Sequence, residues 1–324
     1  MESPPTPVPR RYDLSCQVDA YRHGWSLLRF LTHRFRYHPE DLWSERVREG
    51  AVRVNGEVAD AHTTVRRGDR IGYTIVHAEP AVDFTHHILH EDDDLLAVAK
   101  SGNLPVHAGG KFIANTLIAR LRETYGPELR PAHRLDRETS GVVLFARNAD
   151  AARHLEREFR ERRVDKEYLA VLRGDAPARW TVDAPIARGE PAAPPYFRVV
   201  DDASGKTAVT RFERLARADG SSGAVTLVRA APESGRTNQI RVHAAHSGHP
   251  VLGDKIYGVP EDLAAAFVRD GETPELLAAA GAARHLLHCA RLRVVHPRTG
   301  RPWSAAAPAP DDLVRACPRA WPAV

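Results

Sequence analysis

A nine-residue run, residues 133–141, constrains this chain more than any other part of it. The run places the carboxylate of Asp136 between Arg134 and Arg137, and it ends in a Thr-Ser-Gly turn. The residues that follow, 142–145, predict a buried strand by their length and β-branched content. Because neighbouring cations favour an ionised carboxyl group, the sequence predicts a charged carboxylate held ahead of a buried strand. Such a group suits covalent or acid–base chemistry, and the alternative is that Asp136 only bridges two arginines at a structural corner.

Four segments of the chain, taken in order, resemble the RluA family of pseudouridine synthases. Residues 91–100 resemble its first conserved strand, and residues 133–141 resemble the run that contains its catalytic aspartate. Residues 166–171 resemble the segment that carries its active-site tyrosine, and residues 235–254 resemble the segment that carries its active-site arginine. The resemblance spans about residues 82–300, and four matches in order are more specific than any one of them.

The resemblance implies an enzyme that breaks the N1–C1′ bond of a uridine in RNA, turns the uracil and rejoins it through C5. This isomerisation implies no cofactor and no metal. Asp136 would attack the sugar or remove a C2′ proton, while Arg236 would pair with Asp136 and keep it ionised. Tyr168 would stack on the uracil, and whether it also takes the C5 proton is left open by the sequence. Arg134 would either occupy the space left by the flipped base or act as a second partner of Asp136. Four further residues are expected to bind substrate: His133, Lys166, Asn238 and Ile240.

Two departures from the family pattern stand out. Residues 100–103, Lys-Ser-Gly-Asn, replace a usual Lys-Pro-x-Gly, and Asn238 stands where many members have His. Two other classes of protein remain alternatives. A protein kinase would explain the strand that ends at Lys100 and the run around Asp136. However, this chain has no Gly-rich loop before Lys100 and no D-F-G segment after Asp136. A non-catalytic RNA-binding or ribosome-assembly factor is the second alternative.

Composition favours a protein of the reducing cytoplasm. The 324 residues suffice for one large domain and one small one, and the apolar and charged fractions, 43% and 27%, are ordinary for a globular protein. Three scattered cysteines argue against a disulfide framework or a zinc site. The histidines at 86, 87 and 90 and at 243, 246 and 249 are not expected to bind metal. No apolar run predicts a membrane span, and the first residues lack the features of a signal peptide.

Charge is unevenly distributed along the chain. The formal net charge is only +4, yet residues 77–96 contain six acidic residues and no Lys or Arg. Residues 280–319 contain seven arginines against two aspartates. A fold that separates these charges would present a basic surface to RNA, although a solvated face of mixed charge explains any single patch equally well. RNA is the expected partner, and we expect a monomer that requires no protein partner.

The first 80 residues predict a small module behind an arm. Residues 1–20 are Pro-rich at their start and predict a mobile N-terminal arm. In residues 21–76, two short helices are followed by a hairpin with an Asn-Gly turn at 55–56 and by a further strand ending at Ile71. This pattern resembles the alpha-L-type RNA-binding module of ribosomal proteins, and a small β-rich structural cap is the rival interpretation. The resemblance implies that basic residues on the helices meet RNA phosphates, with four main candidates: Arg29, Arg34, Arg36 and Arg46.

Residues 82–320 predict the catalytic domain. Strand-like runs alternate with helices near 115–125 and 149–162, and the Ala-rich run 275–288 predicts another helix. The expected fold class is α+β, with a mixed, largely antiparallel sheet flanked by helices, as in the family. The added module favours large-subunit ribosomal RNA as substrate, whereas residues 77–82 and 106–112 resemble the branch that acts on the tRNA anticodon stem-loop.

Overall fold

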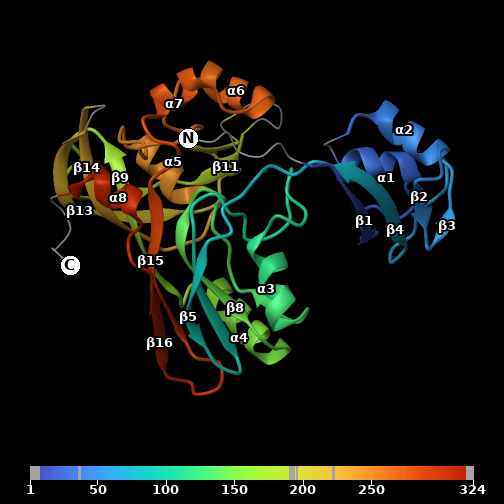
Figure 1. Ribbon diagram of the computed structural model, residues 1–324, viewed down its shortest axis with the longest axis horizontal. Coiled ribbons are helices and arrows are strands. Elements are labelled where there is room, and N and C mark those ends of the chain that lie inside the picture. The colour runs from blue at the N-terminus through green and yellow to red at the C-terminus, as the bar shows by residue number, and fades with distance from the viewer. Residues whose placement is uncertain (1–7, 36–37, 190–193, 195, 221–222, 319–324) are drawn as a thin grey trace. The chain divides into compact units, whose positions relative to one another are not determined.

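The computed structural model describes residues 8–35, 38–189, 194, 196–220 and 223–318. The chain divides into two compact units (Figure 1). Unit 1 comprises residues 1–81 and 109–113, and unit 2 comprises residues 82–108 and 114–324. Each helix in the described ranges is too short or too polar to span a membrane.

Unit 1 is a four-stranded antiparallel sheet covered by two helices. Its elements are β1 (Arg10–Gln17), α1 (Leu27–Arg34), α2 (Glu40–Arg48), β2 (Val52–Val54), β3 (Glu57–Val58) and β4 (Arg70–His77), with strand order β1-β4-β2-β3. Leu27 and Phe30 of α1, Trp43 of α2 and Ile71 of β4 are fully buried in one apolar cluster, so both helices pack on one face of the sheet. The two helices and the hairpin were expected from the sequence.

The start of the chain differs from the expectation. The prediction of a mobile arm over residues 1–20 is wrong for Arg10–Gln17, because β1 pairs with β4 along its whole length. Tyr12, Leu14 and Cys16 pack against the core of unit 1, while the residues between them are exposed. The strand is therefore held by backbone pairing and one half-buried face, and residues 1–7 lie outside the described ranges.

Unit 2 is built on a ten-stranded sheet. The path through the sheet is β10-β13-β14-β9-β15-β8-β6-β5, with β16 paired to β15 and β7 paired to β8. Within this described sheet β15 and β8 are parallel, and the other pairs are antiparallel. The predicted α+β class with a mixed, largely antiparallel sheet is therefore confirmed. The bounds are β5 (His86–Glu91), β6 (Leu95–Lys100), β7 (Arg130–Pro131), β8 (Ser140–Ala146), β9 (Asp165–Arg173), β10 (Arg179–Asp183), β13 (Val209–Gly220), β14 (Gly223–Pro232), β15 (Leu287–Val295) and β16 (Pro302–Ala306).

The centre of this sheet is its most buried part. All seven residues of β8 are buried, and five of the six residues of β6 are as well. Strands buried on both faces read as continuous apolar runs, which is why these two were recognisable in the sequence. A separate two-stranded sheet, β11 (Ile186–Arg188) with β12 (Phe197–Val199), completes the strands of unit 2.

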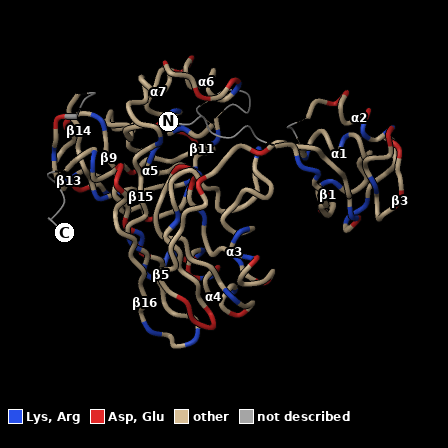
Figure 2. The backbone as a smooth tube through the Cα atoms, in the orientation of Figure 1, with Lys and Arg blue, Asp and Glu red and all other residues tan. Residues whose placement is uncertain are grey.

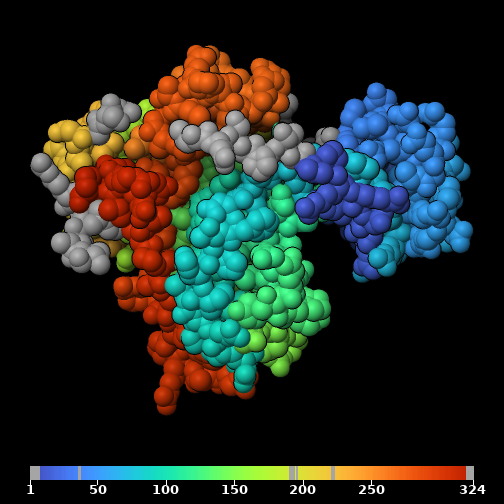
Figure 3. Space-filling view, viewed as in Figure 1, coloured from blue at the N-terminus to red at the C-terminus, as the bar shows by residue number. Residues whose placement is uncertain are grey.

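Helices flank the large sheet. They are α3 (Leu117–Tyr125), α4 (Ala149–Arg160), α5 (Gln239–His246), α6 (Glu261–Asp270), α7 (Pro274–Ala280) and α8 (Asp311–Ala316). Thr116 and Asn148 cap α3 and α4 by accepting hydrogen bonds from the backbone of the first turn. In the space-filling view the last part of the chain, coloured red, forms a continuous stretch of the surface from α8 to the β15–β16 hairpin (Figure 3).

The Ala-rich run was only half correctly predicted. A helix over residues 275–288 was expected, but α7 ends at Ala280 because Gly281 adopts the left-handed conformation, with φ 78°. The residues from Leu287 onward enter β15. Pairing with the neighbouring strands β8 and β9 outweighs the helix propensity of this segment.

Candidate active site

The predicted carboxylate lies in the loop that leads into β8. Ala132 is hydrogen-bonded to the carbonyl of Leu144, and the backbone N–H of Thr139 donates to the carbonyl of Asp136 at 3.1 Å, closing a turn. The side chain of Asp136 is 24% exposed, so it reaches the surface of a pocket from a firmly held backbone.

The ionic partner of Asp136 is Arg241. Its Nη1 donates to Oδ2 of Asp136 at 3.0 Å. On its other edge, Arg241 makes two parallel hydrogen bonds to Asp254: Nε to Oδ2 at 2.6 Å and Nη2 to Oδ1 at 2.8 Å. This fork-to-carboxylate geometry fixes the guanidinium plane and aims its remaining nitrogen at Asp136. Asp254 thus positions Arg241, and Arg241 positions Asp136.

The electrostatics of the site keep Asp254 and Arg241 charged. Burial alone would raise the pKa of the fully buried Asp254, but ion pairing and hydrogen bonding with Arg241 hold it below its ordinary value. Burial would likewise lower the pKa of Arg241, but the carboxylates of Asp254 and Asp136 raise it above its ordinary value. The pocket therefore contains a permanent cation, Arg241, that faces the side chain of Asp136.

The predicted role of Arg236 as partner of Asp136 is wrong. Arg236 lies before α5, and its Nε donates to the carbonyl of Thr207 at 3.2 Å. Arg241 lies within α5, a helix buried over six consecutive residues, so its guanidinium is directed into the interior. The motif contains two arginines, Arg236 and Arg241. The sequence signal for Arg241 as the partner of Asp136 is its place in a helix of buried residues, followed by a carboxylate at Asp254.

Asn238 and Gln239 hold the arginine-bearing segment in place. Asn238 has φ 56°, a left-handed conformation that Asn tolerates, and its side chain donates to Tyr257 and accepts from Arg241. The buried Gln239 accepts from Ser234 and from the backbone of Arg236, and donates to the carbonyl of Val209. Asn238 was predicted as a substrate-binding residue; its side chain instead contacts its own neighbours, although it does line the pocket.

Tyr168 comes from β9 and lines the same pocket. Its side chain is nearly buried, and Cys289 lies opposite it in the register of β9 and β15. Burial, the neighbouring Cys289 and the charge of Asp136 raise the pKa of the Tyr168 phenol well above its ordinary value. The residue therefore presents a neutral aromatic ring to the pocket at neutral pH.

The other predicted substrate-binding residues also line the pocket, but in different ways. The buried Ile240 contributes apolar surface. Arg134 has an exposed side chain with no hydrogen bond or ion pair to the described residues, so it is free to contact a ligand. Lys166 donates from Nζ to the carbonyl of Ser234 at 2.9 Å, and burial lowers its pKa.

His133 is fixed by the fold. Its Nε2 accepts a hydrogen bond from the backbone N–H of Leu144 at 3.1 Å, and its ring stacks on Phe159 at a centroid distance of 5.2 Å. Burial and the nearby Lys166 lower the pKa of His133 to about 4, so the ring is neutral at physiological pH. Its described contacts are those of a residue that ties the loop around Asp136 to β8.

A buried polar network holds the loop around Asp136 from behind. Glu138 accepts from Lys255 at 2.7 Å and from the backbone of His285 at 3.1 Å. Arg284 donates to the carbonyl of Glu138 at 2.8 Å and forms a two-pronged ion pair with Asp312. Sequence analysis missed this network, because its members are far apart along the chain and carry no recognisable spacing.

The segment that departs from the family pattern also supports the loop. Lys100 Nζ and the backbone N–H groups of Asn103 and Leu104 all donate to the carbonyl of Arg137 at 3.0 Å. The side chain of Asn103 also accepts a hydrogen bond from Arg137. The unusual Lys-Ser-Gly-Asn sequence thus anchors the residue next to Asp136.

The pocket itself has a volume of about 530 Å³, which lies within the range of ordinary ligand sites. Six basic side chains line it against only two carboxylates, Asp136 and Glu233. The basic residues are Arg134, Arg160, Arg162, Lys166, Arg236 and Arg241. A polyanionic ligand with one apolar, flat group is what this combination of charge, Tyr168 and Ile240 would accept.

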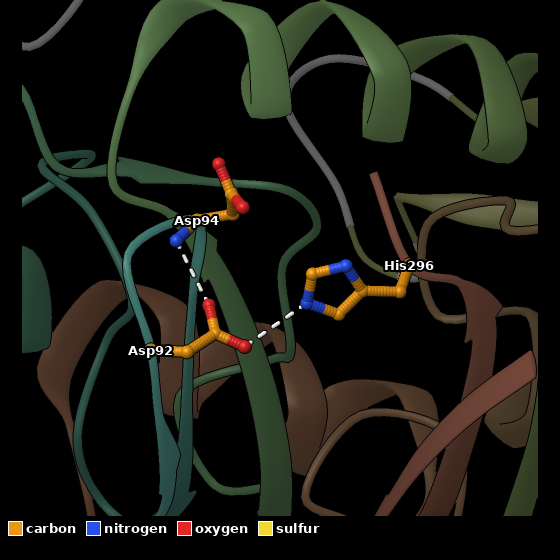
Figure 4. A group of neighbouring side chains, drawn as sticks. All are labelled: Asp92, Asp94 and His296. Carbon is orange, nitrogen blue, oxygen red and sulfur yellow. Dashed lines mark hydrogen bonds and ion pairs between the residues drawn. The ribbon is translucent and has the colours of Figure 1, made fainter. Parts of the chain in front are cut away.

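A cluster of possible metal ligands lies elsewhere in unit 2. Ligand atoms of Asp92, Asp94 and His296 lie within 4.8 Å of one another (Figure 4). However, Asp92 already accepts from two backbone N–H groups, at Asp94 and Leu95, and from the imidazoles of His90 and His296. These oxygens are saturated by hydrogen bonds that join two turns of the fold, so the arrangement fits a structural junction and not a metal site.

Among the described residues, the basic side chains predicted on unit 1 differ in their exposure and contacts. Arg29 and Arg34 are exposed on α1, and the Arg29 guanidinium lies 4.2 Å from the ring centroid of Trp25. Arg46 on α2 is half-buried and donates to the carbonyl of Thr74, in a hollow that also contains Arg53. Arg36 lies outside the described residues.

Comparisons with known proteins agree with the resemblance. A family model described as RNA pseudouridylate synthase matches residues 94–246. Ribosomal large subunit pseudouridine synthase D of Xanthomonas campestris pv. campestris is 36% identical over 283 residues, which cover 84% of this chain and 82% of that protein. The mitochondrial tRNA pseudouridine(32) synthase of Saccharomyces cerevisiae is 32% identical over 70% of this chain, which spans about half (49%) of that protein. Among solved structures, human RNA pseudouridylate synthase domain containing 1 has a TM-score of 0.57 and 28% identity, covering 74% of this chain and 90% of that one.

Proposed function

The chain belongs to the RNA pseudouridylate synthase family, and we propose that Asp136, held by Arg241, acts on the ribose of a uridine in structured RNA. The activity is the isomerisation of uridine to pseudouridine. The observation that carries the proposed role of Asp136 is its ion pair with Arg241, whose other edge is bound to the buried Asp254. A carboxylate aimed into a basic pocket is what chemistry at a sugar carbon of RNA requires.

Each proposed role follows from what the side chain contacts. The Asp136 carboxylate acts at the ribose, so that the N1–C1′ bond breaks and the C5–C1′ bond forms. Tyr168 stacks on the uracil and Ile240 supports it from the apolar side of the pocket. Because the raised pKa of Tyr168 keeps the phenol protonated, we assign it the stacking role and not that of a phenolate base for the C5 proton. Arg134, with its exposed and unengaged guanidinium, occupies the space that the flipped base leaves.

We further propose large-subunit ribosomal RNA as the substrate. The support is the match over most of both chains with the large-subunit enzyme, against a match to about half of the tRNA enzyme. The tRNA anticodon stem-loop is the second candidate.

Unit 1 is proposed to bind RNA phosphates through α1. The support is that Arg29 and Arg34 are both exposed on this helix. Replacing both by Gln should reduce the slope of log affinity against log salt by about 1.8 on duplex RNA, taking roughly 0.9 for each lost phosphate contact. Replacing Arg66 and Arg67, on the loop before β4, removes the same charge and should leave the slope closer to the wild-type value. Equal slopes for the two double variants would argue for a structural cap instead.

The substrate is tested by mapping pseudouridine in ribosomal RNA and tRNA of the source organism with and without the gene. We expect a large-subunit ribosomal site to disappear on deletion and to return with the wild-type gene but not with Asp136→Asn. Loss of a tRNA site with an unchanged ribosomal map would make the ribosomal assignment wrong.

We also propose that the enzyme acts as a monomer in the cytoplasm without a required protein partner. The three cysteines are all free in the structure, which is compatible with a reducing compartment. Activity of the purified chain, with its mass in solution measured by light scattering, tests the monomer directly.

A further inference from the structure

A second groove opens beside the active-site pocket. Its volume is about 470 Å³, and it lies over the ends of β9, β14 and β15 together with the β13 residue Arg211. Five residues line both the pocket and this groove: Arg162, Val164, Lys166, Pro232 and Glu233. The two hollows therefore share a wall, and the groove directly adjoins the pocket on this side.

The groove carries an excess of positive charge that the protein does not neutralise. Six basic side chains line it against three carboxylates. Arg211 is paired with Glu233, and Arg229 is paired with Glu213 and with Glu167. Two further arginines of the groove, Arg291 and Arg293, are exposed and have no hydrogen bond or ion pair to side chains in the described ranges.

The position of these two arginines makes them a fixed pair. They are two residues apart on β15, so their side chains leave the same face of the sheet about 6.8 Å apart along the strand. Strand β15 is paired on both sides here, to β9 and to β16, which keeps the two Cα positions rigid. Figure 2 shows basic residues along β15 where it passes β9. Guanidinium groups at such a spacing match neighbouring phosphates of an extended strand.

The register explains why the pair stays available. Arg291 lies opposite Glu167 and Arg293 lies opposite Asp165, so each has a carboxylate on the adjacent strand. Glu167, however, is bound to Arg229 at 3.4 Å, and Asp165 forms no ion pair with any described residue. The protein thus places two carboxylates near the pair without using them to hold it, and a stronger anion can bind it.

We propose that this groove, lined by Arg291 and Arg293, binds the phosphates of a single-stranded RNA segment directly next to the target uridine. The inference rests on the proposed function and adds the part of the substrate that lies outside the catalytic pocket. Flipping a base costs least where its nucleotide is already unpaired, so we take the segment at the pocket exit to be single-stranded. The groove then determines that the enzyme needs an extended strand on one side of the target.

The test uses the full-length chain and fluorescein-labelled oligouridylates of increasing length. The wild-type protein should bind longer oligonucleotides more tightly until the groove is filled. In Arg291→Gln/Arg293→Gln the gain with length should disappear, and the salt slope should fall by about 1.4, taking roughly 0.7 for each phosphate on a single strand. Between 50 and 200 mM salt the affinity of the wild type should therefore fall about sevenfold more than that of the variant.

Two further variants separate groove binding from general electrostatics. Arg120→Gln/Arg217→Gln removes the same charge from exposed positions that line neither hollow, and should keep the wild-type length dependence. Arg291→Lys/Arg293→Lys keeps the charge, so it should recover most of the salt slope while losing the two-pronged contacts. All three variants change exposed side chains and should unfold at the wild-type temperature.

The outcomes separate this inference from the proposed function. If the Arg291/Arg293 variant and the Arg120/Arg217 variant lose affinity and salt slope equally, the groove is not an RNA site. Wild-type pseudouridine formation on unmodified ribosomal RNA is measured in parallel. If the wild type forms no pseudouridine on ribosomal RNA, the proposed ribosomal substrate is wrong, whereas the binding data alone decide the groove.

Discussion

The ion pair between Arg241 and Asp136 leads to the most specific prediction. Replacing Arg241 by Met removes a 3.0 Å contact to Asp136 and both hydrogen bonds to Asp254. A hydrogen bond to a charged group contributes about 1.5–3 kcal/mol, and each 1.36 kcal/mol corresponds to a factor of ten in rate. If the lost contact acts only through the placement of Asp136, the chemical step should slow by roughly 10- to 150-fold.

The same substitution has a cost in stability that must be measured separately. Asp254 is fully buried, and Arg241→Met removes its cation and leaves it with two backbone hydrogen bonds, from Ile256 and Tyr257. Breaking a buried ion pair from one side costs about 3–5 kcal/mol. Arg241→Lys keeps a cation in the interior but cannot contact both carboxylates with one fork, so its rate should lie between those of the wild type and the Met variant.

Single-turnover pseudouridine formation with enzyme in excess of RNA measures the effect. Arg236→Ala is the comparison, because the side chain of Arg236 donates to the Thr207 carbonyl and its loss leaves the partner of Asp136 in place. Its chemical step should slow by at most about threefold, equivalent to roughly 0.7 kcal/mol. If Arg236→Ala slowed the step as much as Arg241→Met, the assignment of Arg241 as the partner of Asp136 would be refuted.

Three further predictions concern the fold around the site. Tyr168→Phe keeps the ring and should retain most of the single-turnover rate; a loss as large as that of Tyr168→Ala would show that the hydroxyl takes part in proton transfer. Burial lowers the pKa of His288 from 6.5 to about 4. As the pH is lowered from 6.5 to 4, the unfolded chain therefore binds a proton that the folded chain does not, and the free energy of unfolding decreases by roughly 3 kcal/mol. His288→Gln should remove this part of the pH dependence in urea unfolding, and an unchanged profile would contradict it. Gly141 has φ 110°, and a Cβ there would lie 2.2 Å from the Cys289 carbonyl oxygen. Gly141→Ala should therefore lower the free energy of unfolding, measured by urea titration, by more than the roughly 1–3 kcal/mol that the positive φ alone costs. A smaller loss would show that β15 moves aside.

Sequence patterns predicted the elements that are held by apolar runs. β6 and β8 are buried on both faces and therefore appear in the sequence as continuous apolar segments. β1 was missed because only alternate residues of Arg10–Gln17 are even partly buried, and the strand depends on pairing with β4. The helix predicted over residues 275–288 ends before Gly281, and the residues from 287 onward form β15. Local helix propensity does not include the pairing of β15 with its neighbouring strands, so the prediction was too long.

The residues of the pocket were largely predicted, but the ion pairs between them were not. Asp136 and Tyr168 lie in one pocket as expected, because each belongs to a motif with a single residue of its type. Arg236 was chosen over Arg241 because both lie within one short segment, and only the buried helix and the distant Asp254 show which of them faces Asp136. The supporting contacts of Glu138 with Lys255 join residues more than a hundred positions apart, which no local pattern records.

The most direct test of the account is the single-turnover rate of Asp136→Asn on unmodified ribosomal RNA. Asn keeps the shape of the side chain and one acceptor oxygen, but it carries no charge with which to act at the ribose. We predict that the variant folds and binds RNA, and that pseudouridine formation falls by more than about three orders of magnitude, roughly 4 kcal/mol of barrier. Pseudouridine formation by Asp136→Asn at close to the wild-type rate would contradict the central claim.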